Sequence, residues 1–305
     1  MTPPKITVVG SYVVGMTIRA PRFAVVGESL IGTDFDMGPG GKGSNQAIGA
    51  ARLGAQVRLL EKIGQDLFAR EALDFYLSEG MDTRYVIQDP ESYTGVAFIT
   101  LNPAGENLIV VDVGANERLS PEDVDAFQPV IADSDVVMSI LEIRAETAAR
   151  AMALGRQAGA VTILNPAPAR QLPETIYQDV DVLTPNETEL KILLGMAPDE
   201  PANVIDLARA IQKRGVKAVV VTRGGAGALV VHPDGQVTQV PGITVDVVDT
   251  TGAGDAFNAA LATALGEGLD LVEATRFAVI GGGLCCTRLG VIPALPYRQE
   301  LDARR

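Results

Sequence analysis

Short apolar runs alternate with segments of helical spacing from about residue 130 onward. The β-rich runs, each followed by a helical segment, are ADSDVVMSI at 132–140, AVTILN at 160–165 and DVDVLT at 179–184. A helix predicted between the N-cap Asn203 and Gly215 places on one face Val204, Leu207, Ala208 and Ile211. The next run, KAVVVT at 217–222, is almost wholly apolar, as in a buried parallel strand. This alternation predicts an α/β fold with a mostly parallel central sheet flanked by helices.

Two stretches interrupt the alternation. Residues from about 12 to 38 have strand-like character broken by glycine and proline, and residues 93–113 predict an antiparallel hairpin around a Pro-Ala-Gly turn. Together they predict a small β-sheet that projects from the main body and covers a site as a lid. The alternative is a pair of ordinary edge hairpins.

Charge and the length of the apolar runs exclude several classes of protein. The 305 residues include 38 acidic and 25 basic ones, a net charge of −13, whereas nucleic-acid binding needs a basic surface. The longest uncharged apolar stretch, 277–286, is about half of the roughly 20 residues that a membrane span needs. The N-terminal residues have no export-signal pattern, so we expect a cytoplasmic protein with no nucleic-acid or membrane partner.

Cysteine and histidine are too rare for several kinds of chemistry. The cysteines, Cys285 and Cys286, are adjacent, which suits neither a disulfide framework nor a zinc site, so we interpret them as small buried apolar residues. The single histidine, His232, precedes a Pro-Asp-Gly turn and is expected in an exposed loop. Serine–histidine triads and histidine metal sites are therefore disfavoured, and any catalysis must use carboxylates, lysines, backbone amides and bound ions.

The strongest chemical signal is the turn Asp249-Thr-Thr-Gly-Ala-Gly-Asp255. Residues 243–247 before it alternate as in a strand, and the residues after it have helical spacing. A glycine-rich turn between a strand and a helix exposes backbone N–H groups at the positive end of the helix dipole, which suits an oxyanion or a phosphate. Asp255 falls in the first helical turn, either as a catalytic group or as a helix cap.

Two further elements supply polar groups. The glycine-rich run 38–47 leads into a predicted helix, and its Lys42 and Asn45 are donors for hydroxyl or phosphate oxygens, although the run is equally typical of a tight turn before a helix. Asn186 and Glu189 share one face of another predicted helix, where they would either hold hydrated Mg²⁺ or form a capping box.

Four motifs, in order, resemble one family. They are Gly-Gly-Lys-Gly-x-Asn-Gln at 40–46, Asn-Pro-Ala-Pro-Ala at 165–169, Thr-Pro-Asn-Glu-x-Glu at 184–189 and Asp-Thr-x-Gly-Ala-Gly-Asp at 249–255. This pattern resembles the ribokinase (PfkB-type) carbohydrate kinases over roughly residues 5–300. The resemblance implies a single domain, 1–305, whose segments 12–38 and 93–113 form a lid over a site for ATP and a sugar.

The resemblance also implies a role for individual residues. Asp255 matches the catalytic base, which takes the proton of the attacking sugar hydroxyl. An anion hole of backbone amides for the transferring phosphoryl group matches Gly252, Ala253 and Gly254. Sugar-contacting positions match Gly41, Lys42, Asn45 and Glu142. Such an assembly suits phosphoryl transfer, which needs positioning and charge stabilisation more than covalent chemistry.

Further positions resemble the family's nucleotide and ion sites. Asn186 and Glu189 match residues that serve the nucleotide phosphates and Mg²⁺. The nucleotide-binding turn at 222–227 includes Thr222, Gly224, Gly225 and Gly227. A monovalent cation such as K⁺ is held in the family mainly by backbone oxygens, at positions matching Asp249, Thr251, Cys285, Arg288, Gly290 and Ala294.

The sequence departs from the family where the sugar is recognised. The family has Gly-Ser-x-Asn-x-Asp after its first strand, and here Val13 and Gly15 stand in place of the asparagine and aspartate that bind sugar hydroxyls. Losing such groups removes charge-assisted hydrogen bonds that contribute about 1.5–3 kcal/mol each. Either ribose is a poor substrate, or Asp34 or Asp36 on the following strand replaces the missing groups.

We therefore expect an ATP-dependent kinase that phosphorylates a primary hydroxyl of a sugar, with ribose the leading candidate. A ketohexose, a sugar acid or a nucleoside are alternative substrates, and a catalytically silent sugar- or nucleotide-sensing relative is the alternative to an enzyme. The intact Asp255, anion-hole glycines and Glu189 favour the enzyme. The expected cofactors are ATP, Mg²⁺ and K⁺, and pairing of two lids into a homodimer is common among ribokinases.

Overall fold

The computed structural model describes residues 2–104 and 106–305. Within them the main sheet has nine strands in the order β13-β12-β11-β10-β9-β8-β1-β4-β5. Neighbouring strands are parallel except β11–β12 and β12–β13, which are antiparallel. The strands are β1 (Lys5–Val9), β4 (Gln56–Ile63), β5 (Val86–Gln88), β8 (Val136–Ser139), β9 (Val161–Leu164), β10 (Val182–Leu183), β11 (Ala218–Thr222), β12 (Ala228–Val231) and β13 (Val237–Val240).

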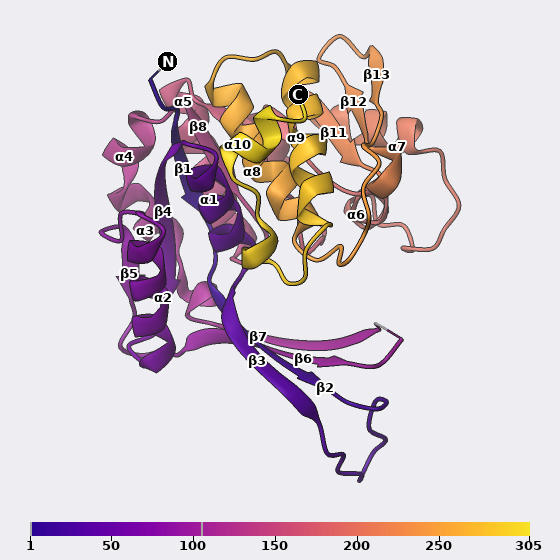
Figure 1. The fold of residues 1–305 in the computed structure, drawn as a ribbon. Helices are drawn as coiled ribbons and strands as arrows, with labels where there is room; N and C mark the ends of the chain where they lie inside the picture. The colour runs from indigo at the N-terminus through magenta and orange to yellow at the C-terminus, as the bar shows by residue number, and fades with distance from the viewer. Residues whose placement is uncertain (1, 105) are drawn as a thin grey trace.

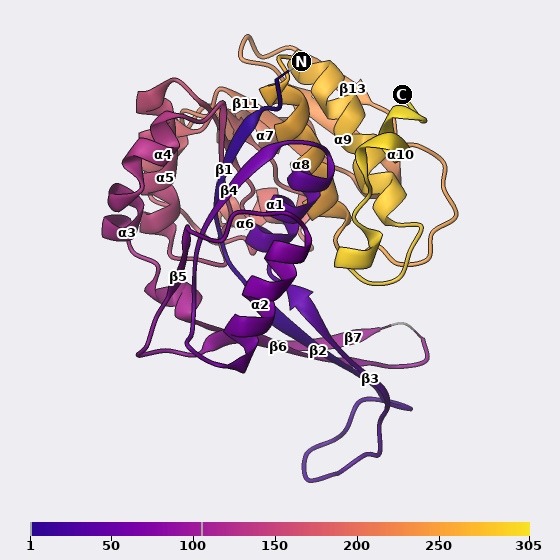
Figure 2. The ribbon, with the colours of Figure 1, turned by 60° about the vertical axis from the view of Figure 1, so that its left-hand side comes forward.

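Helices cover both faces of this sheet (Figures 1 and 2). One layer consists of α1 (Lys42–Arg52), α2 (Leu67–Ser78), α8 (Ala253–Gly266), α9 (Leu271–Cys285) and α10 (Arg298–Asp302). The other consists of α3 (Pro121–Ala126), α4 (Gln128–Ala132), α5 (Ala145–Ala158), α6 (Glu187–Leu193) and α7 (Val204–Gln212). Short 3₁₀ turns lie at Ala115–Arg118, Glu174–Asp179, Gly224–Ala226 and Ile292–Ala294. None of the helices among the described residues has both the length and the apolarity to cross a bilayer.

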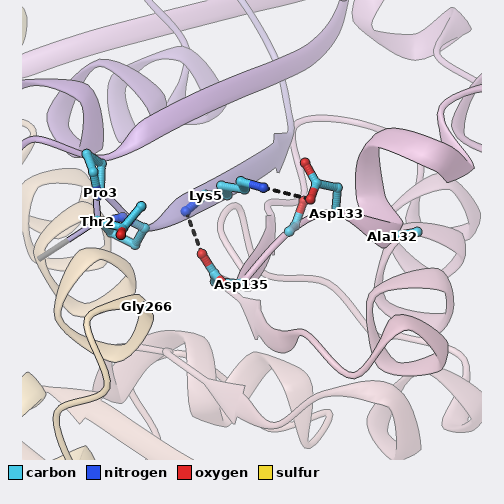
Figure 3. A pocket seen from close by; sticks show the side chains of 9 residues that line it. Thr2, Pro3, Lys5, Ala132, Asp133, Asp135 and Gly266 are labelled. Carbon is cyan, nitrogen blue, oxygen red and sulfur yellow. Dashed lines mark hydrogen bonds and ion pairs between the residues drawn. The ribbon is translucent and has the colours of Figure 1, made fainter.

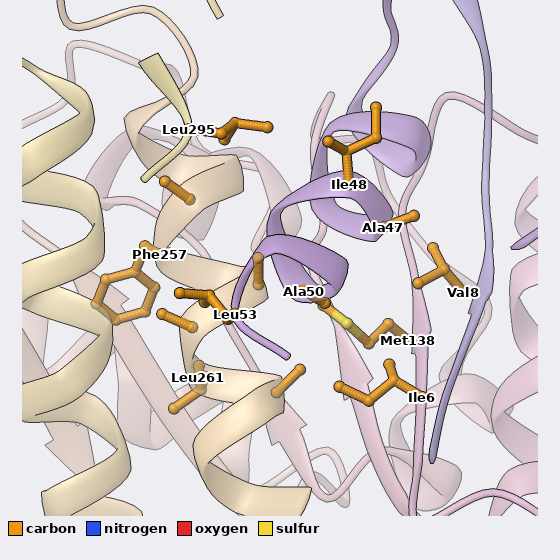
Figure 4. Close-up of a cluster of buried hydrophobic side chains, with 14 of the residues drawn as sticks. Ile6, Val8, Ala47, Ile48, Ala50, Leu53, Met138, Phe257, Leu261 and Leu295 are labelled. Carbon is orange, nitrogen blue, oxygen red and sulfur yellow. The ribbon is translucent and has the colours of Figure 1, made fainter. Parts of the chain in front are cut away.

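The two faces of the inner strands belong to two separate hydrophobic cores. On β8, Met138 packs with the α1 and α8 layer, whereas Val137 packs with the α5 layer. Figure 4 shows Met138 beside Ile6 and close to side chains of α1 and α8. A strand buried on both faces needs apolar residues at successive positions, which explains the continuous apolar runs of the sequence. The predicted α/β fold with a mostly parallel, helix-flanked sheet is confirmed.

A second, smaller sheet projects from this body (Figure 1). Its strand order is β3-β2-β6-β7, with β2 and β6 parallel and the two outer pairs antiparallel. The strands are β2 (Val13–Arg19), β3 (Thr33–Gly40), β6 (Thr94–Leu101) and β7 (Asn107–Gly114). They come from the two stretches of sequence that interrupt the α/β alternation. The predicted hairpin is β6–β7, and Gly105 in its turn lies outside the described residues.

The strand predicted at 243–247 is wrong. This segment has no ladder partner, and the main sheet ends at the edge strand β13. It instead runs along α9, where a Cβ atom on Gly283 would lie 2.6 Å from Ile243 Cγ1, and Val248 N donates to the carbonyl of Cys286 at 2.8 Å. Of the alternating apolar residues, Ile243 packs against α9, whereas Val247 is exposed. β-propensity without a paired strand does not make a sheet.

Two single-residue predictions also need correction. His232 is partly buried, because its Nε2 lies 2.9 Å from Thr238 Oγ1 across the β12–β13 hairpin. Cys285 is buried as expected, whereas Cys286 is partly exposed at the end of α9. Both cysteines are free thiols.

Candidate active site

The polar residues of the sequence motifs gather at the carboxyl ends of the parallel strands. At or just after these strand ends lie Ser11 (β1), Asn165 (β9), Thr184 (β10) and Thr222 (β11). Open α/β sheets bind their ligands at this edge. Figure 3 shows a surface hollow at the opposite, amino-terminal edge, where Lys5 Nζ is already paired with Asp133 at 2.7 Å. The candidate active site is therefore at the carboxyl edge.

Helices α1 and α8 cross at this edge with almost no space between them. A Cβ atom on Gly49 would lie 2.7 Å from the Cβ of Ala259, so only glycine fits at the crossing. About one helical turn earlier on each helix, Asn45 and Asp255 meet. The small residues at the crossing thus bring together two polar residues that are 210 positions apart in the sequence.

Asp255 is a buried carboxylate with 6% of its surface exposed. Its Oδ2 accepts a hydrogen bond from Asn45 Nδ2 at 2.8 Å, and its Oδ1 accepts one from Gln46 Nε2 at 3.0 Å. These bonds go to α1 and not to the first-turn amides of its own helix, as those of a helix cap would. The carboxylate of Asp255 is thus held from the α1 side, and its oxygens keep lone pairs that can accept a hydrogen bond from a substrate hydroxyl.

The N-terminus of α8 is open beside Asp255. Its N-cap residue, Gly252, has a left-handed φ of 81° and no side chain caps the helix. A Cβ on Gly252 would lie 2.7 Å from Val291 Cγ1, whereas one on Gly254 would meet nothing within 4 Å. The amide of Ala253 makes one long bond of 3.3 Å to the carbonyl of Thr250. The positive end of the helix dipole is therefore available to an anion.

Lys42 and Glu142 lie on the small-sheet side of the same site. Glu142 Oε2 accepts from Ser11 Oγ at 2.6 Å and from the backbone amide of Lys42 at 2.7 Å. The negative charge of Asp255, followed by those of Glu142 and Glu189, raises the pKa of Lys42 although burial opposes this. Burial raises the pKa of Glu142. The lysine therefore remains charged among three carboxylates.

Asn186 and Glu189 form the capping box that was one of the two sequence interpretations. Asn186 Oδ1 accepts from Glu189 N at 2.7 Å, and Glu189 Oε2 accepts from Asn186 N at 2.8 Å. Burial raises the pKa of Glu189. The negative charge of Asp255 acts in the same direction, whereas the hydrogen bond from the Asn186 amide and the positive charge of Lys42 oppose it. The amide of Thr222 donates to Pro185 O at 2.9 Å, so the glycine turn 224–227 begins next to this capping box.

The charges of the site bear on whether a divalent cation fits it. Asp255, Glu142 and Glu189 outnumber Lys42, so a polyphosphate arriving alone would meet an excess of negative charge. Among the described residues, no group of three or more His, Cys, Asp or Glu side chains is arranged to hold a metal ion. These residues fit a hydrated Mg²⁺ held mainly by phosphate oxygens, with Glu189 as a carboxylate partner, better than an ion in a protein cage.

Four of the residues expected around a monovalent cation contact one another behind the α8 turn, namely Asp249, Thr251, Cys285 and Gly290. Asp249 Oδ1 accepts from Thr251 N at 2.9 Å, and Asp249 Oδ2 accepts from Gly290 N at 3.0 Å. Burial acts to raise the pKa of Asp249, but these hydrogen bonds outweigh it and lower the pKa. Cys285 Sγ contacts the carbonyl of Thr251 at 3.7 Å, while Arg288 is engaged in an ion pair with Glu300. Ala294 closes the last 3₁₀ turn of this segment.

One face of the small sheet is apolar near its base. Ladder partners place on this face Val13, Gly15, Ala97, Ile99 and Val111. Val13 and Ala97 are buried yet belong to neither hydrophobic core, whereas Val14 on the other face packs against the body. Strand β3 of this sheet leads directly into Gly41 and Lys42. Both positions where the family has polar groups, Val13 and Gly15, therefore lie on an apolar wall.

The aspartates that would compensate lie farther out. Asp36 is opposite Thr17 in the β2–β3 ladder and is exposed. Asp34 lies at an irregularity of that ladder with a positive φ of 51°, and Thr33 Oγ1 donates to its Oδ2 at 3.1 Å. Asp36 therefore lies on the same face as Val13 and Gly15 but farther from the body, and the base of the wall at these two residues has no carboxylate of its own.

Several polar residues of the site have no role in the sequence interpretation. They are Ser11, Gln46, Thr184 and Asn258, together with Asn165 of the Asn-Pro-Ala-Pro-Ala motif. Gln46 and Asn165 belong to two of the four motifs that resemble the family, and this membership is the sequence signal by which they could have been found. Their contacts join segments 119 positions apart, so spacing alone does not reveal them.

A helix-flanked parallel sheet, with an open helix N-terminus beside a buried aspartate at its carboxyl edge, defines an α/β small-molecule kinase. Residues 4–298 match the model of the pfkB family carbohydrate kinases, and the chain belongs to this family. It is an ATP-dependent sugar kinase.

Known relatives are similar to this chain over nearly its whole length. A ribokinase of Haemophilus influenzae is 35% identical over 295 residues, covering 97% of this chain and 96% of the relative. A deoxyribokinase of Salmonella typhimurium is 37% identical over 298 residues, covering 97% of both chains. The structure of Arabidopsis thaliana ribokinase complexed with ribose and ATP has a TM-score of 0.91 at 29% identity, covering 99% of this chain and 98% of the other.

Proposed function

We propose that the chain transfers the γ-phosphoryl group of ATP to a primary hydroxyl of a pentose, with ribose as the leading candidate. The observation that supports this best is the buried carboxylate of Asp255 beside the uncapped N-terminus of α8. The ribokinase relatives, and the neighbouring structure that contains ribose and ATP, support the choice of sugar.

Each side chain of the site has a part in this proposal. Asp255 takes the proton of the sugar hydroxyl, and the amides of Gly252, Ala253 and Gly254 stabilise the charge on the transferring phosphoryl group. Sugar hydroxyls are contacted by Gly41, Lys42, Asn45 and Glu142. Asn45 lies beside the proposed base, because its Nδ2 donates to Asp255 Oδ2 at 2.8 Å.

The nucleotide lies, in the proposal, between the 222–227 turn and the N-terminus of α6. Thr222, Gly224, Gly225 and Gly227 provide a close approach to backbone, because a Cβ on Gly224 or Gly225 would meet nothing within 4 Å, while Gly227 packs tightly against Val240 O and fixes the turn. Asn186 and Glu189 serve the phosphates and the accompanying Mg²⁺, which neutralises phosphate charge when it is bound. A monovalent cation, K⁺, is proposed at the segment formed by Asp249, Thr251, Cys285, Arg288, Gly290 and Ala294. The use of ATP and the free thiols suit the cytoplasm.

A second substrate class, a deoxypentose, is favoured by the apolar wall of the small sheet. A site that lacks hydrogen-bonding groups discriminates little against a substrate that lacks the matching hydroxyl. Val13 and Gly15 give such a wall, and the relative named deoxyribokinase is 37% identical. We propose that the small sheet closes over the sugar as a lid with this wall inward.

Steady-state kinetics over a panel of sugars tests both substrates. ADP formation should be measured with ribose, 2-deoxyribose, fructose, a sugar acid and a nucleoside. The proposal expects turnover of ribose and 2-deoxyribose with similar kcat/KM, and absence of sugar-dependent ADP formation with the whole panel would refute it. The double variant Val13→Asn with Gly15→Asp should raise selectivity for ribose about 10-fold or more. A Cβ at Gly15 meets nothing closer than 3.7 Å, and Thr100→Asn on the opposite face is the matched control.

We propose that the small sheet pairs with a second copy of the chain through the face opposite the apolar wall, which we call the outer face. Its exposed apolar side chains, neighbours in the ladders, are Ile18, Met37, Phe98, Leu108 and Val110. Phe98, at the centre of this strip, is 56% exposed. Sedimentation velocity should find a dimer in the native protein and a monomer for Phe98→Glu, and a native monomer at micromolar concentration would contradict the proposal.

A further inference from the structure

Gln46 is a fully buried residue next to Asp255 that the proposed reaction does not use directly. Its Nε2 donates to Asp255 Oδ1 at 3.0 Å and to Asn165 Oδ1 at 3.0 Å. Its exposed surface is 0%, so it cannot contact a substrate in this arrangement. Whatever Gln46 contributes to the reaction must act through Asp255.

The orientation of the Gln46 amide follows from its neighbours. Asn165 Nδ2 donates to Thr184 O at 3.0 Å, which turns Asn165 Oδ1 toward Gln46. Asp255 is also an acceptor, so both groups that face Gln46 Nε2 accept hydrogen bonds. A flipped amide would place an oxygen against two oxygens. The nitrogen of Gln46 therefore has to point at Asp255.

The same chain of hydrogen bonds continues to the nucleotide side of the site. Thr184 Oγ1 donates to Asn258 Oδ1 at 2.6 Å, and Asn258 Nδ2 donates to Gly254 O at 2.8 Å. Thr184 directly precedes Pro185 and Asn186. Buried polar side chains thus connect α1, the ends of β9 and β10, and the first turn of α8.

The arrangement also has a cost in stability. Gln46 Oε1 is buried without a partner, and such an atom destabilises the folded state because its desolvation is not compensated. A residue present only for packing would be expected to be apolar at this place. The uncompensated oxygen indicates that the donor at the other end of the amide is what the site requires.

We infer that Gln46, anchored by Asn165, is a positioning residue that fixes the carboxylate of Asp255 toward the acceptor hydroxyl. The inference rests on the proposed function, because it assigns Asp255 as the base. Gln46→Met keeps the side-chain volume and removes the donor. We expect kcat to fall about 10- to 100-fold, with KM for sugar and for ATP within about 2-fold, since small misplacements of reacting groups have effects of this size.

A double-mutant cycle distinguishes positioning from general damage. In the Asp255→Asn background, Gln46→Met should change kcat less than about 2-fold, because the group it positions is gone. Asn165→Leu, which removes the anchor of Gln46 together with the bond to Thr184 O but leaves the donor to Asp255, should give a smaller drop in kcat with the same dependence on Asp255. Gln56→Met, at the opposite edge of the sheet, is the matched control and should leave all constants unchanged.

Three results would overturn the inference. One is an equal drop in kcat with and without Asp255, and another is a raised KM for the sugar with unchanged kcat. The third is loss of the folded state in both Gln46→Met and Asn165→Leu, which would make the chain of bonds structural. Urea midpoints of the same four-protein cycle report the coupling of Gln46 and Asp255 without any turnover. A wild-type chain that forms no ADP with any sugar would refute the proposed function separately.

Discussion

Glu61 on β4 is a fully buried carboxyl group behind the sugar side of the site. Its Oε1 accepts a hydrogen bond from the hydroxyl of Tyr76 at 2.7 Å, and its Oε2 has no partner. Burial raises the pKa of Glu61 from 4.5 to about 8. Tyr76 in turn contacts the ring of Tyr12, with ring centroids 5.9 Å apart, and Tyr12 lies between Ser11 and Val13.

This pKa shift makes folding stability depend on pH in a stated direction. The folded protein keeps the proton of Glu61 up to about pH 8, whereas the unfolded chain loses it above pH 4.5. Between these values the unfolded chain binds fewer protons, so the free energy of unfolding falls as pH rises, by about 1.4 kcal/mol per pH unit. From pH 5.5 to 7.5 this single group lowers stability by roughly 2–3 kcal/mol.

Glu61→Gln should abolish this slope. The amide keeps the shape and an acceptor for Tyr76 but cannot ionise, so any constant cost of its buried N–H groups leaves the pH dependence untouched. Urea unfolding followed by circular dichroism at pH 5.5, 6.5 and 7.5 gives the free energy of unfolding of both proteins. The variant's advantage over wild type should grow by about 1.4 kcal/mol at each step. A difference that is constant over this range would show that Glu61 is ionised in the folded protein.

Three further outcomes test the site and the packing beneath it. Asp255→Asn should keep the fold and the affinity for ATP and lower kcat by at least about 100-fold, measured as ADP release, and near-native turnover would exclude Asp255 as the base. Replacing K⁺ by a bulky organic cation should lower kcat more than KM, because the ion orders the turn that begins at Asp249; equal rates in both salts would refute the cation site alone. Gly49→Val should lower the free energy of unfolding by about 1–3 kcal/mol, since even a Cβ would lie 2.7 Å from Ala259, and unchanged urea stability would mean that the two helices have room to separate.

Local signals of the sequence were sufficient for the fold class. Strands such as β8 and β11 are buried on both faces, so their apolar runs are continuous and easily distinguished from helical spacing. The turn before α8 was likewise readable, because Gly252 needs a left-handed φ and leaves the helix uncapped. In both cases the physical requirement acts within a few neighbouring residues.

Features that depend on distant neighbours were not readable in this way. The alternation at 243–247 does not form a strand, because this segment runs along α9, a helix that comes later in the chain. Gln46 and Asp255 are 209 positions apart, and nothing in either local sequence indicates that the amide donates to the carboxylate. The apolar wall also depends on distant neighbours, because Gly15 and Ala97 share a face only through the parallel ladder of β2 and β6.

The charges at the carboxyl edge explain why such a site needs its ions. Lys42 is flanked by the carboxylates of Asp255, Glu142 and Glu189, which keep it protonated but leave little positive charge for a polyphosphate. The N-terminus of α8 adds only about half a positive charge. In the proposed reaction, the charge that develops on the transferring phosphoryl group is therefore stabilised mainly by cations, namely those that would arrive with the nucleotide and the one proposed behind the 249–255 turn. In the proposed mechanism the base, Asp255, lies at the α1–α8 contact, where Asn45 and Gln46 hold it, whereas the N-terminus of α8 stays open to the phosphate.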